Sequence, residues 1–471
     1  MSEPRTTEPH HGGGYAAVSY WLESCDDDLT PRPPLDTSID VDVAVLGAGY
    51  TGLWTAYYLQ QRDPALRIAI VEKEIAGFGA SGRNGAWCTS GFGAGPSLLR
   101  ERYSVDVAAA VHDIMVDTVA EVGRVCEHEG IDAHYQRDGE MVLARGEHQL
   151  PALHHIEQEF AAIGRGDFWT RLDADAARDR LAVADIRGAI HQSASAAVHP
   201  GRLVRGLARV VEARGATIFE QTPATSWTEG GHPVLHTTSG DVRARVVVLA
   251  GEGYLSQLDA LHRQVLPLYS LIVLTEPLDA DQLDAIRWNH RTVLQSTALT
   301  VDYLSRTRDG RILFGGRGAP YHFGSRIRHE YDRHEATHER LRALVREWFP
   351  QLGDIRFTHA WGGSVGVPRD FMPTMTYDRA SGIASSRGYT GEGVAASNLG
   401  GRVLADQICG LDSDLVRLPM VGHRSRNWEP EPLRWIATRY LQRASLRIDA
   451  KAAATGRAPT GKSLAERLIS H

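Results

Sequence analysis

Cysteine is scarce in this sequence, and long apolar runs are missing. The 471 residues include four cysteines, none in a C-x-x-C pair, which argues against a disulfide framework or a zinc knuckle. No stretch approaches the roughly 18 uninterrupted apolar residues of a membrane span. Residues 1–14 are polar and lack the apolar centre of a secretory signal. We therefore expect a cytoplasmic protein without a membrane span.

Basic residues are also in short supply. The chain has 51 Lys and Arg against 58 Asp and Glu, a formal net charge of −7, whereas nucleic-acid binders present a net basic surface. A general nucleic-acid partner is therefore not expected. With 42% apolar and 23% charged residues the composition is that of a globular protein. The length suits about three domains, or two large interleaved ones.

The most informative pattern is a strand, a glycine turn, a helix and a second strand. A short β-branched apolar run precedes a G-x-G-x-x-G, and the second strand ends in an acidic residue, Glu72. A lone glycine motif is weak, but the complete series indicates a dinucleotide site; an ordinary glycine-rich βαβ turn is the alternative. The four parts are residues 41–46, 47–52, 53–60 and 67–71.

Each residue type in this pattern has a physical role. Gly47 permits the tight turn, Gly49 lets a pyrophosphate approach the backbone, and Gly52 lets helix and strand pack closely. Free N–H groups and the partial positive charge at the helix start hold the phosphates. Glu72 lies where a carboxylate accepts hydrogen bonds from the adenosine ribose. The dinucleotide contacts expected here are Gly47, Gly49, Tyr50, Thr51, Gly52, Glu72 and Lys73.

A second G-x-G-x-x-G follows at residues 77–82. It has no strand of its own before it and no helical pattern after it, so it does not predict a second nucleotide site. We interpret it as a loop whose backbone approaches the cofactor closely. An exposed flexible loop is the alternative.

These motifs resemble those of the D-amino-acid-oxidase-like superfamily of FAD-dependent amine oxidases. Residues 42–72 and 77–85 carry the resemblance, and Ser-Gly-Arg-Asn-Gly at 81–85 is most similar to the γ-glutamylputrescine oxidase-like branch. One departure is Glu392, where branch members commonly carry histidine. The resemblance spans nearly the whole chain after residue 40. Further matching segments are 199–204, 246–251, 309–316 with Tyr303, 388–394 and 428–435.

The resemblance implies an α/β fold with two domains. One is an FAD/NAD(P)-binding Rossmann-like domain assembled from three separate segments. The other is an α+β substrate domain that contains an antiparallel sheet. We expect an N-terminal tail with an anchoring strap near Trp21. A basic helical tail should end the chain, docked on the FAD domain or, alternatively, free for a membrane surface or a partner. The expected ranges are 1–39 for the first tail, 40–100, 190–260 and 360–411 for the FAD domain, 101–189 and 261–359 for the substrate domain, and 412–471 for the last tail.

The resemblance also implies the cofactor and its contacts. The expected cofactor is FAD without a covalent link, because residues 359–364 lack the cysteine that tethers FAD in monomeric sarcosine oxidases. A helix start after Gly393 supplies positive potential to the flavin. The FAD contacts implied in addition to the turn are Ala80, Ser81, Gly82, Arg83, Asn84, Gly85, Ala250, Gly251, Gly391, Gly393 and Val394.

The implied reaction is oxidation of a C–N bond in a small amine or amino acid to an imine, with O2 reduced to H2O2. Four residues are catalytic candidates. Arg83 is a flavin-side cation or a clamp for a substrate carboxylate, or else a surface salt-bridging residue. Tyr303 and Tyr389 are substrate hydrogen-bonders or satisfied core tyrosines. Glu392 binds a substrate ammonium or is a carboxylate stabilised at a helix start.

Several alternatives stay open from the sequence. An amine dehydrogenase with another electron acceptor and an aminophosphonate oxidoreductase both use the same fold. A related tRNA-modifying enzyme is disfavoured by the net charge of −7. His334-Glu335-Ala336-Thr337-His338 is an H-E-x-x-H, as in zinc hydrolases, but no third ligand is evident and the segment is strongly charged. We therefore predict no metal site, and the sequence carries no signal for an oligomeric state.

Overall fold

Six strands from distant parts of the chain form the first sheet. The computed structural model describes residues 14–469, so the first 13 residues of the expected N-terminal tail lie outside it. The strand order is β19-β20-β13-β2-β3-β9, with five parallel strands and β19 antiparallel to β20. The strands are β2 (Val43–Leu46), β3 (Ile68–Val71), β9 (Thr217–Phe219), β13 (Val246–Leu249), β19 (Thr374–Asp378) and β20 (Ile383–Arg387).

Four helices pack on one face of this sheet and share its apolar core. Close packing is visible where Gly401 meets Trp54, since an added Cβ at Gly401 would lie 2.7 Å from the Trp54 Cβ. Helix α4 comes from the segment expected in the substrate domain, yet Met115 and Val119 are buried in this core. The helices are α2 (Tyr50–Arg62), α4 (Val105–His128), α7 (Pro200–Ala213) and α10 (Gly393–Cys409).

A smaller sheet covers the opposite face of the first one. Its order is β1-β12-β11-β10, and Leu235 and Val242 pack against Ala44, Val247 and neighbouring strand residues. The first sheet is therefore covered on both faces, as the continuous apolar runs of its parallel strands predict. The strands of the smaller sheet are β1 (Ile39–Asp40), β10 (Ala224–Thr228), β11 (Val234–Thr237) and β12 (Asp241–Arg243).

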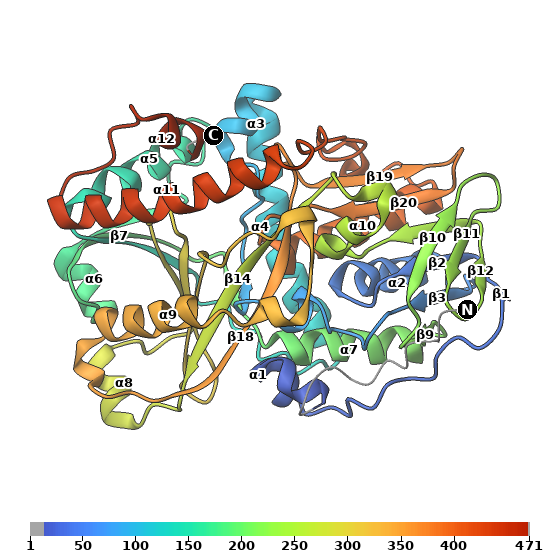
Figure 1. Cartoon of the computed structure of the whole chain (residues 1–471), viewed down its shortest axis with the longest axis horizontal. Helices are drawn as coiled ribbons and strands as arrows, with labels where there is room; N and C mark the ends of the chain where they lie inside the picture. Colours follow the sequence, from blue (N-terminus) through green and yellow to red (C-terminus); the bar gives the residue numbers. More distant parts are fainter. Residues whose placement is uncertain (1–13, 470–471) are drawn as a thin grey trace.

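An eight-stranded sheet forms the other half of the molecule (Figure 1). Its order is β18-β14-β17-β16-β15-β5-β7-β6, antiparallel except for the parallel pair β15 and β5. The expected α/β fold with an antiparallel second sheet is confirmed. The strands are β5 (Glu140–Arg145), β6 (Thr170–Asp173), β7 (Ile186–Gln192), β14 (Leu266–Thr275), β15 (Val293–Ser296), β16 (Asp302–Arg306), β17 (Ile312–Gly316) and β18 (Phe357–Val367).

Helices lie on both faces of the eight-stranded sheet. One face shares a core with three helices, in which Trp348 and Leu341 are fully buried. On the other face Leu153 packs on Val142 and Ile190. Strands β7 and β18 cross the domain boundaries expected at 190 and 360. The helices are α6 (Ala174–Arg180), α8 (Ala280–Ile286) and α9 (Glu335–Trp348) on the first face and α5 (Leu150–Ala161) on the second.

A two-stranded ribbon connects the two halves. It pairs β4 (Trp87–Cys88) with β8 (Ala196–Ala197), and α3 (Pro96–Arg102) follows it along the chain. On the outer edge of β8, Gln136 N donates to Ala197 O at 2.9 Å. The ribbon therefore stands between the loop that precedes β4 and the segment around Gln136.

The N-terminal strap lies at the start of the part of the chain that the structure describes. In α1 (Tyr20–Glu23) the Trp21 Nε1 donates to Asn84 O at 2.8 Å, and the preceding Ser19 Oγ donates to Gly82 O at 2.6 Å. The strap is thus anchored on the second glycine loop. Among residues 14–469 no helix is long and apolar enough to cross a membrane.

The C-terminal helix does not dock on the FAD-binding half as expected. In α11 (Leu433–Thr455), Gln442 Nε2 donates to Ala319 O at 2.9 Å, and Asp449 accepts from the N–H groups of Leu299 and Thr300. These partners belong to the connections beside β16 and β17, so α11 covers the eight-stranded half (Figure 1). The short α12 (Leu464–Ile469) follows.

Candidate flavin and substrate site

The first glycine turn leaves no room for side chains. Gly47 has φ +103°, and an added Cβ there would lie 2.9 Å from Ala250 O. At Gly52 an added Cβ would lie 2.0 Å from Gly47 O, closer than any real carbon contact. An added Cβ at Gly49 would lie 2.8 Å from Ser81 Oγ. The turn is a bare backbone cradle at the N-terminus of α2, where phosphates bind.

Glu72 lies at the carboxyl end of β3, beside this turn. Its two carboxylate oxygens accept from Ala48 N at 2.9 Å and Glu74 N at 3.0 Å. Burial raises the pKa of Glu72 to about 7. The side chain nevertheless remains partly exposed, whereas Lys73 points into solvent. Glu72 therefore stands fixed at the place expected for a ribose ligand.

The second glycine loop packs directly on the first turn and is not an exposed flexible loop. Gly77 N donates to Ala48 O at 3.0 Å, and Tyr50 N donates to Ser81 Oγ at 2.9 Å. The Asn84 side chain bonds the loop internally, donating to the carbonyls of Ala80 and Ser81. The next four backbone carbonyls of the loop each accept a hydrogen bond from a side chain elsewhere in the chain. These bonds run from Ser19 to Gly82 O, from Trp361 to Arg83 O, from Trp21 to Asn84 O and from Ser305 to Gly85 O.

Glu252 joins three distant segments behind the cradle, a role that sequence reasoning missed. Its buried carboxylate accepts from Gly366 N at 2.8 Å, Gly388 N at 2.9 Å and Tyr389 N at 3.2 Å. Glu252 directly follows Ala250 and Gly251, two of the expected FAD contacts. That position in the sequence could have indicated its role. Three more of the residues expected to contact FAD follow Tyr389 in the chain. They are Gly391, which has φ +110°, and Gly393 and Val394 at the start of α10.

Arg83 is buried and paired. Its Nη1 lies 2.5 Å from Asp332 Oδ2, its Nε donates to Phe78 O, and its guanidinium stacks 4.4 Å from the Phe78 ring centroid. The Nη2 is buried without a hydrogen-bond partner among the described residues. A carboxylate already neutralises this arginine, so only that one donor is left for a ligand.

Tyr303 lies against the loop at Gly85, and Glu392 lies against Gly91, further along the same segment. The Tyr303 hydroxyl is 2.8 Å from Ser270 Oγ, and its ring stands where a side chain at Gly85 would be. Glu392 accepts a 2.6 Å hydrogen bond from Thr89 Oγ1. Burial raises the pKa of Glu392, against the effects of the Thr89 hydrogen bond and of the positive charge of Arg317. Both side chains remain partly exposed.

Arg317 is the second residue that sequence reasoning missed. It directly follows β17, and burial lowers its pKa against the opposing effects of Tyr303 and Glu392. It is partly exposed and makes no ion pair within residues 14–469. Arg317 follows Gly315 and Gly316 at the end of β17, beside Tyr303. An arginine directly after two glycines was the sequence pattern that could have indicated this residue.

A second buried carboxylate, Glu140, lies near Glu392. It accepts from Gln192 at 3.0 Å, Ser195 at 3.2 Å and Gln295 at 2.7 Å. Burial and the negative charge of Glu392 raise its pKa to about 7. The region therefore has two carboxyl groups and one unpaired arginine.

Tyr389 has a different position from the other candidates. Its hydroxyl lies 2.9 Å from Thr51 Oγ1 and 2.8 Å from Ser386 Oγ, and the side chain is buried. These bonds tie the first turn of α2 to the segment before α10. Tyr389 therefore fits the alternative of a core tyrosine whose hydroxyl is satisfied within the protein, and we do not propose it as a substrate ligand.

The H-E-x-x-H segment starts a helix. His334 caps α9 and its Nδ1 lies 2.9 Å from Thr337 Oγ1, while the buried His338 Nε2 lies 3.2 Å from Trp361 O. Glu335 is exposed and pairs with Arg342. Within the part of the chain that the structure describes, no group of three or more His, Cys, Asp or Glu side chains is placed to hold a metal ion.

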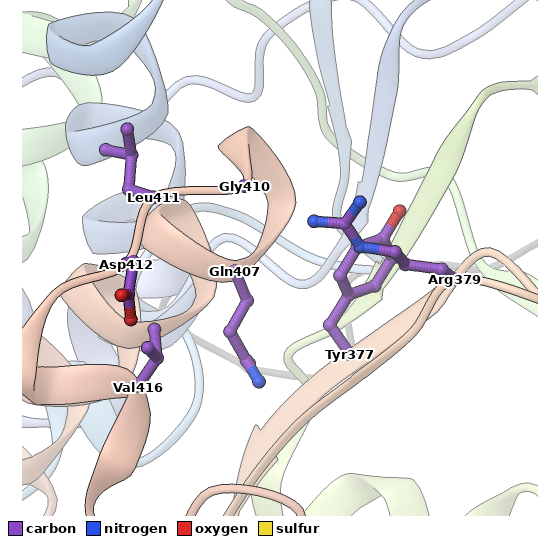
Figure 2. Close-up of a pocket in the computed structure, with 7 residues that line it drawn as sticks. All are labelled: Tyr377, Arg379, Gln407, Gly410, Leu411, Asp412 and Val416. Atoms are coloured by element: carbon purple, nitrogen blue, oxygen red, sulfur yellow. The ribbon is translucent and has the colours of Figure 1, made fainter.

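A small hollow of about 260 Å³ lies at the far end of α10 (Figure 2). Figure 2 shows side chains from the end of α10 and the loop after it facing Tyr377 and Arg379. The helix has 17 residues, so this hollow is roughly 24 Å from the α10 N-terminus and separate from the cradle. Its other lining residues are Gln407, Gly410, Leu411, Asp412 and Val416.

The residues at the cradle fit a flavin adenine dinucleotide. Backbone without side chains surrounds the α2 N-terminus, and Glu72 is positioned for a ribose. Two buried donors, Arg83 Nη2 and Ser364 Oγ, have no hydrogen-bond partner among the described residues. A family model described as DAO, FAD dependent oxidoreductase, matches residues 42–407.

The chain belongs to the FAD-dependent oxidoreductase (DAO) family. Gamma-glutamylputrescine oxidoreductase of Escherichia coli (strain K12) is 28% identical over 395 residues, covering 83% of this chain and 89% of that protein. A probable oxidoreductase, OrdL, of Rhizobium meliloti (strain 1021) is 28% identical over 407 residues, 84% of this chain and 89% of its own. The expected superfamily and branch are thereby confirmed.

Solved structures of other enzymes share the fold. Glycine oxidase from Geobacillus kaustophilus superposes with a TM-score of 0.67 at 21% identity, covering 82% of this chain and 99% of that chain. The likeness supports the arrangement of a cradle sheet beside a large antiparallel sheet. This protein is therefore an FAD-dependent oxidoreductase, and the glycine turn, the second glycine loop and the start of α10 remain the predicted FAD contacts.

Proposed function

We propose that this oxidoreductase oxidises the C–N bond of a small molecule that carries both an amine and a carboxylate. The observation that carries the proposal is the placement of two opposite charges: Arg317 interacts with both Tyr303 and Glu392, and Glu392 lies against Thr89 and Gly91. FAD, when bound, supplies the two-electron acceptor. The amine loses two electrons and two protons and becomes an imine, which water hydrolyses to a carbonyl compound and a free amine.

The two charges have complementary roles. Arg317 lacks an ion-pair partner in the described chain, and a guanidinium binds a carboxylate through two parallel N–H donors. Glu392 accepts from the substrate ammonium, and Thr89 holds its carboxylate in place. Tyr303 fixes the space between Gly85 and Gly315 and keeps its hydroxyl on Ser270. A carboxylate and an ammonium on one small molecule would satisfy both groups.

The relatives support this substrate class. Gamma-glutamylputrescine oxidoreductase and glycine oxidase are named for substrates that contain amines and carboxylates. An aminophosphonate also offers an anion to Arg317 and is the second candidate. The absence of the branch histidine at Glu392 favours a substrate whose ammonium lies next to that carboxylate.

We further propose that FAD is held without a covalent bond in a cytoplasmic enzyme. All four cysteines are free, and Cys88, near the loop at Gly85, is fully buried. Burial strongly raises the pKa of the Cys88 thiol, so this residue is a poor nucleophile. Acid precipitation of the yellow holoenzyme should release the flavin into the supernatant. Colour retained in the pellet would contradict a non-covalent link.

The electron acceptor in this proposal is O2, which is reduced to H2O2. The test is a panel of amines, amino acids, γ-glutamyl amines and aminophosphonates, with flavin absorbance and peroxide release measured together. Anaerobic bleaching by a carboxylate-bearing amine, followed by stoichiometric peroxide in air, is the expected result. Bleaching without peroxide would replace O2 by another acceptor. No bleaching by any amine would overturn the proposed function.

A further inference from the structure

A second hollow, of about 700 Å³, lies on the other side of the β4–β8 ribbon. Its walls are the C-terminal half of α4, the segment 131–137, and Arg291 and Arg308. Gln136 pairs with the outer edge of β8, whose inner edge pairs with β4. Strand β8 thus lies between Gln136, on the wall of the hollow, and β4. Nothing in the flavin chemistry uses the hollow.

The lining of this hollow, which we name the basic hollow, is rich in arginine. Four arginines and two carboxylates line it. Arg124 is neutralised on its own helix, 2.7 Å from Glu121 and 3.3 Å from Asp117. The other three arginines are not balanced in this way. The charged lining residues are Arg124, Arg137, Arg291, Arg308, Glu127 and Asp132.

Arg291 is buried and bonded to carbonyl groups only. Its guanidinium donates to His134 O at 2.5 Å, to Arg306 O at 2.8 Å and to Val198 O at 3.5 Å. Carbonyl oxygens satisfy its donors without cancelling its charge. Burial and the positive charges of Arg306 and Arg308 lower the pKa of Arg291 to about 10. The wall of the hollow therefore contains a buried cation that has two arginines and one carboxylate, Asp138, as its charged neighbours.

Asp132 is shared among several cations. Its carboxylate lies 3.4 Å from Arg202, 3.7 Å from Arg308 and 3.7 Å from His134. The Nε atoms of Arg202 and Arg306 are buried and donate no hydrogen bond to any described residue. One carboxylate thus faces two arginines, and donors beside the hollow are unused. Asp26 and Asp138 offset part of this charge, since Asp26 lies 3.3 Å from Arg202 and the Asp138 carboxylate accepts from Arg291 N at 2.7 Å. Even so, the four arginines that line the hollow outnumber its two lining carboxylates.

We propose that the basic hollow binds a small anion with two or more negative charges, a phosphate ester or a polycarboxylate. Its volume lies within the range of small-molecule sites. Guanidinium groups bind phosphate and carboxylate oxygens in pairs, and Arg137 and Arg308 are exposed enough to turn toward a ligand. Among residues 14–469 the Arg137 side chain makes one hydrogen bond, from its Nε to Ala194 O. Arg291 adds the buried charge behind them.

The test is calorimetric titration of the holoenzyme at low ionic strength with inorganic pyrophosphate, ADP and citrate. We expect saturable binding with a dissociation constant below about 1 mM for at least one of them. The variant Arg137→Glu/Arg308→Glu should weaken that binding at least about tenfold, because two direct charge-assisted hydrogen-bond donors are lost. Its flavin content should match the unmodified enzyme, which shows that it folds.

A matched control distinguishes a specific anion site from general electrostatic attraction of the anion to the protein. Arg209→Glu/Arg356→Glu makes the same change in net charge at exposed arginines paired with Asp27 and Glu276. This control should bind the anion as the unmodified enzyme does. Binding of pyrophosphate and ADP alone would identify a phosphate site, and binding of citrate alone a carboxylate site. No binding of any of the three, or equal weakening in both double variants, would overturn the proposal.

Discussion

The hydroxyl of Thr89 donates a 2.6 Å hydrogen bond to the carboxylate of Glu392. This bond joins the loop after β4 to the residue that starts α10, although the two are 303 positions apart in the chain. It holds the partly exposed Glu392 side chain in place, where the positive charge of Arg317 acts on it. The first prediction concerns this pair.

Glu392→Gln should lower kcat/KM for amines about 10- to 100-fold, the value of a lost hydrogen bond between charged groups. Burial raises the pKa of Glu392, so the acidic limb of the kcat/KM profile should lie above the ordinary range of a glutamate and should vanish in this variant. Thr89→Val should move that limb to higher pH, because the Thr89 hydrogen bond lowers the pKa of Glu392. An unchanged limb in both variants would contradict the role of Glu392.

Arg317→Met should discriminate between substrates. Loss of a bidentate guanidinium should reduce kcat/KM for a carboxylate-bearing amine by about 100-fold, since hydrogen bonds to charged groups are worth about 1.5–3 kcal/mol each. A simple alkylamine of similar size should lose little. Steady-state kinetics with both amines gives the ratio. An equal loss for both would show that Arg317 only supports the fold.

Gly52→Ala should abolish flavin binding or folding, because the new Cβ would lie 2.0 Å from Gly47 O. The matched control is Gly231→Ala, where an added Cβ meets nothing within 4 Å and the backbone is not in the left-handed region. The absorbance of purified protein near the flavin bands gives the occupancy. A fully yellow Gly52→Ala protein would contradict the close packing of turn and helix.

The apoprotein should lose stability as pH rises from about 5 to 8. Burial raises the pKa of Glu72 to about 7 from its ordinary 4.5, so the folded state binds the proton more tightly in this window. Thermal unfolding of Glu72→Gln apoprotein should show a smaller decrease, and its FAD dissociation constant should rise about tenfold or more. Glu276→Gln is the control, because Arg356 lowers the pKa of that exposed carboxylate and its effect falls at lower pH.

Asp332→Asn should destabilise the protein by about 3–5 kcal/mol, because it leaves the buried Arg83 guanidinium without its counterion. Denaturant unfolding of the holoenzyme measures the change. Breaking the Arg356–Glu276 pair by Glu276→Gln should cost far less stability, because solvent screens an ion pair at the surface. Similar costs for the two variants would mean that Arg83 does not depend on its partner.

Local patterns made much of the cradle predictable. Residues 41–72 form a strand, a turn, a helix and a strand because their glycines, β-branched residues and apolar runs all act over a few positions. The glycine spacing also placed Glu72 correctly at the end of β3. The second glycine loop could be distinguished from a second nucleotide site because it lacks a strand and a helix of its own, whereas its packing on the first turn was not predicted.

Long-range partners were not predictable from such patterns. No sequence pattern near Arg83 predicts its ion pair with Asp332, which lies 249 positions later in the chain. Glu252 and Arg317 take their roles from segments that only the fold brings together. The tail helix likewise contains apolar residues at helical spacing, but the surface that receives it lies around Ala319 and Thr300.

Helix α10 and strand β20, near the end of the chain, pack against α2 and β13 from earlier parts. During synthesis the glycine turn at 47–52 leaves the ribosome long before residues 383–409 exist. We therefore expect the proposed flavin site to be complete only when translation is nearly finished, and a chain that ends before α10 to fail to retain FAD.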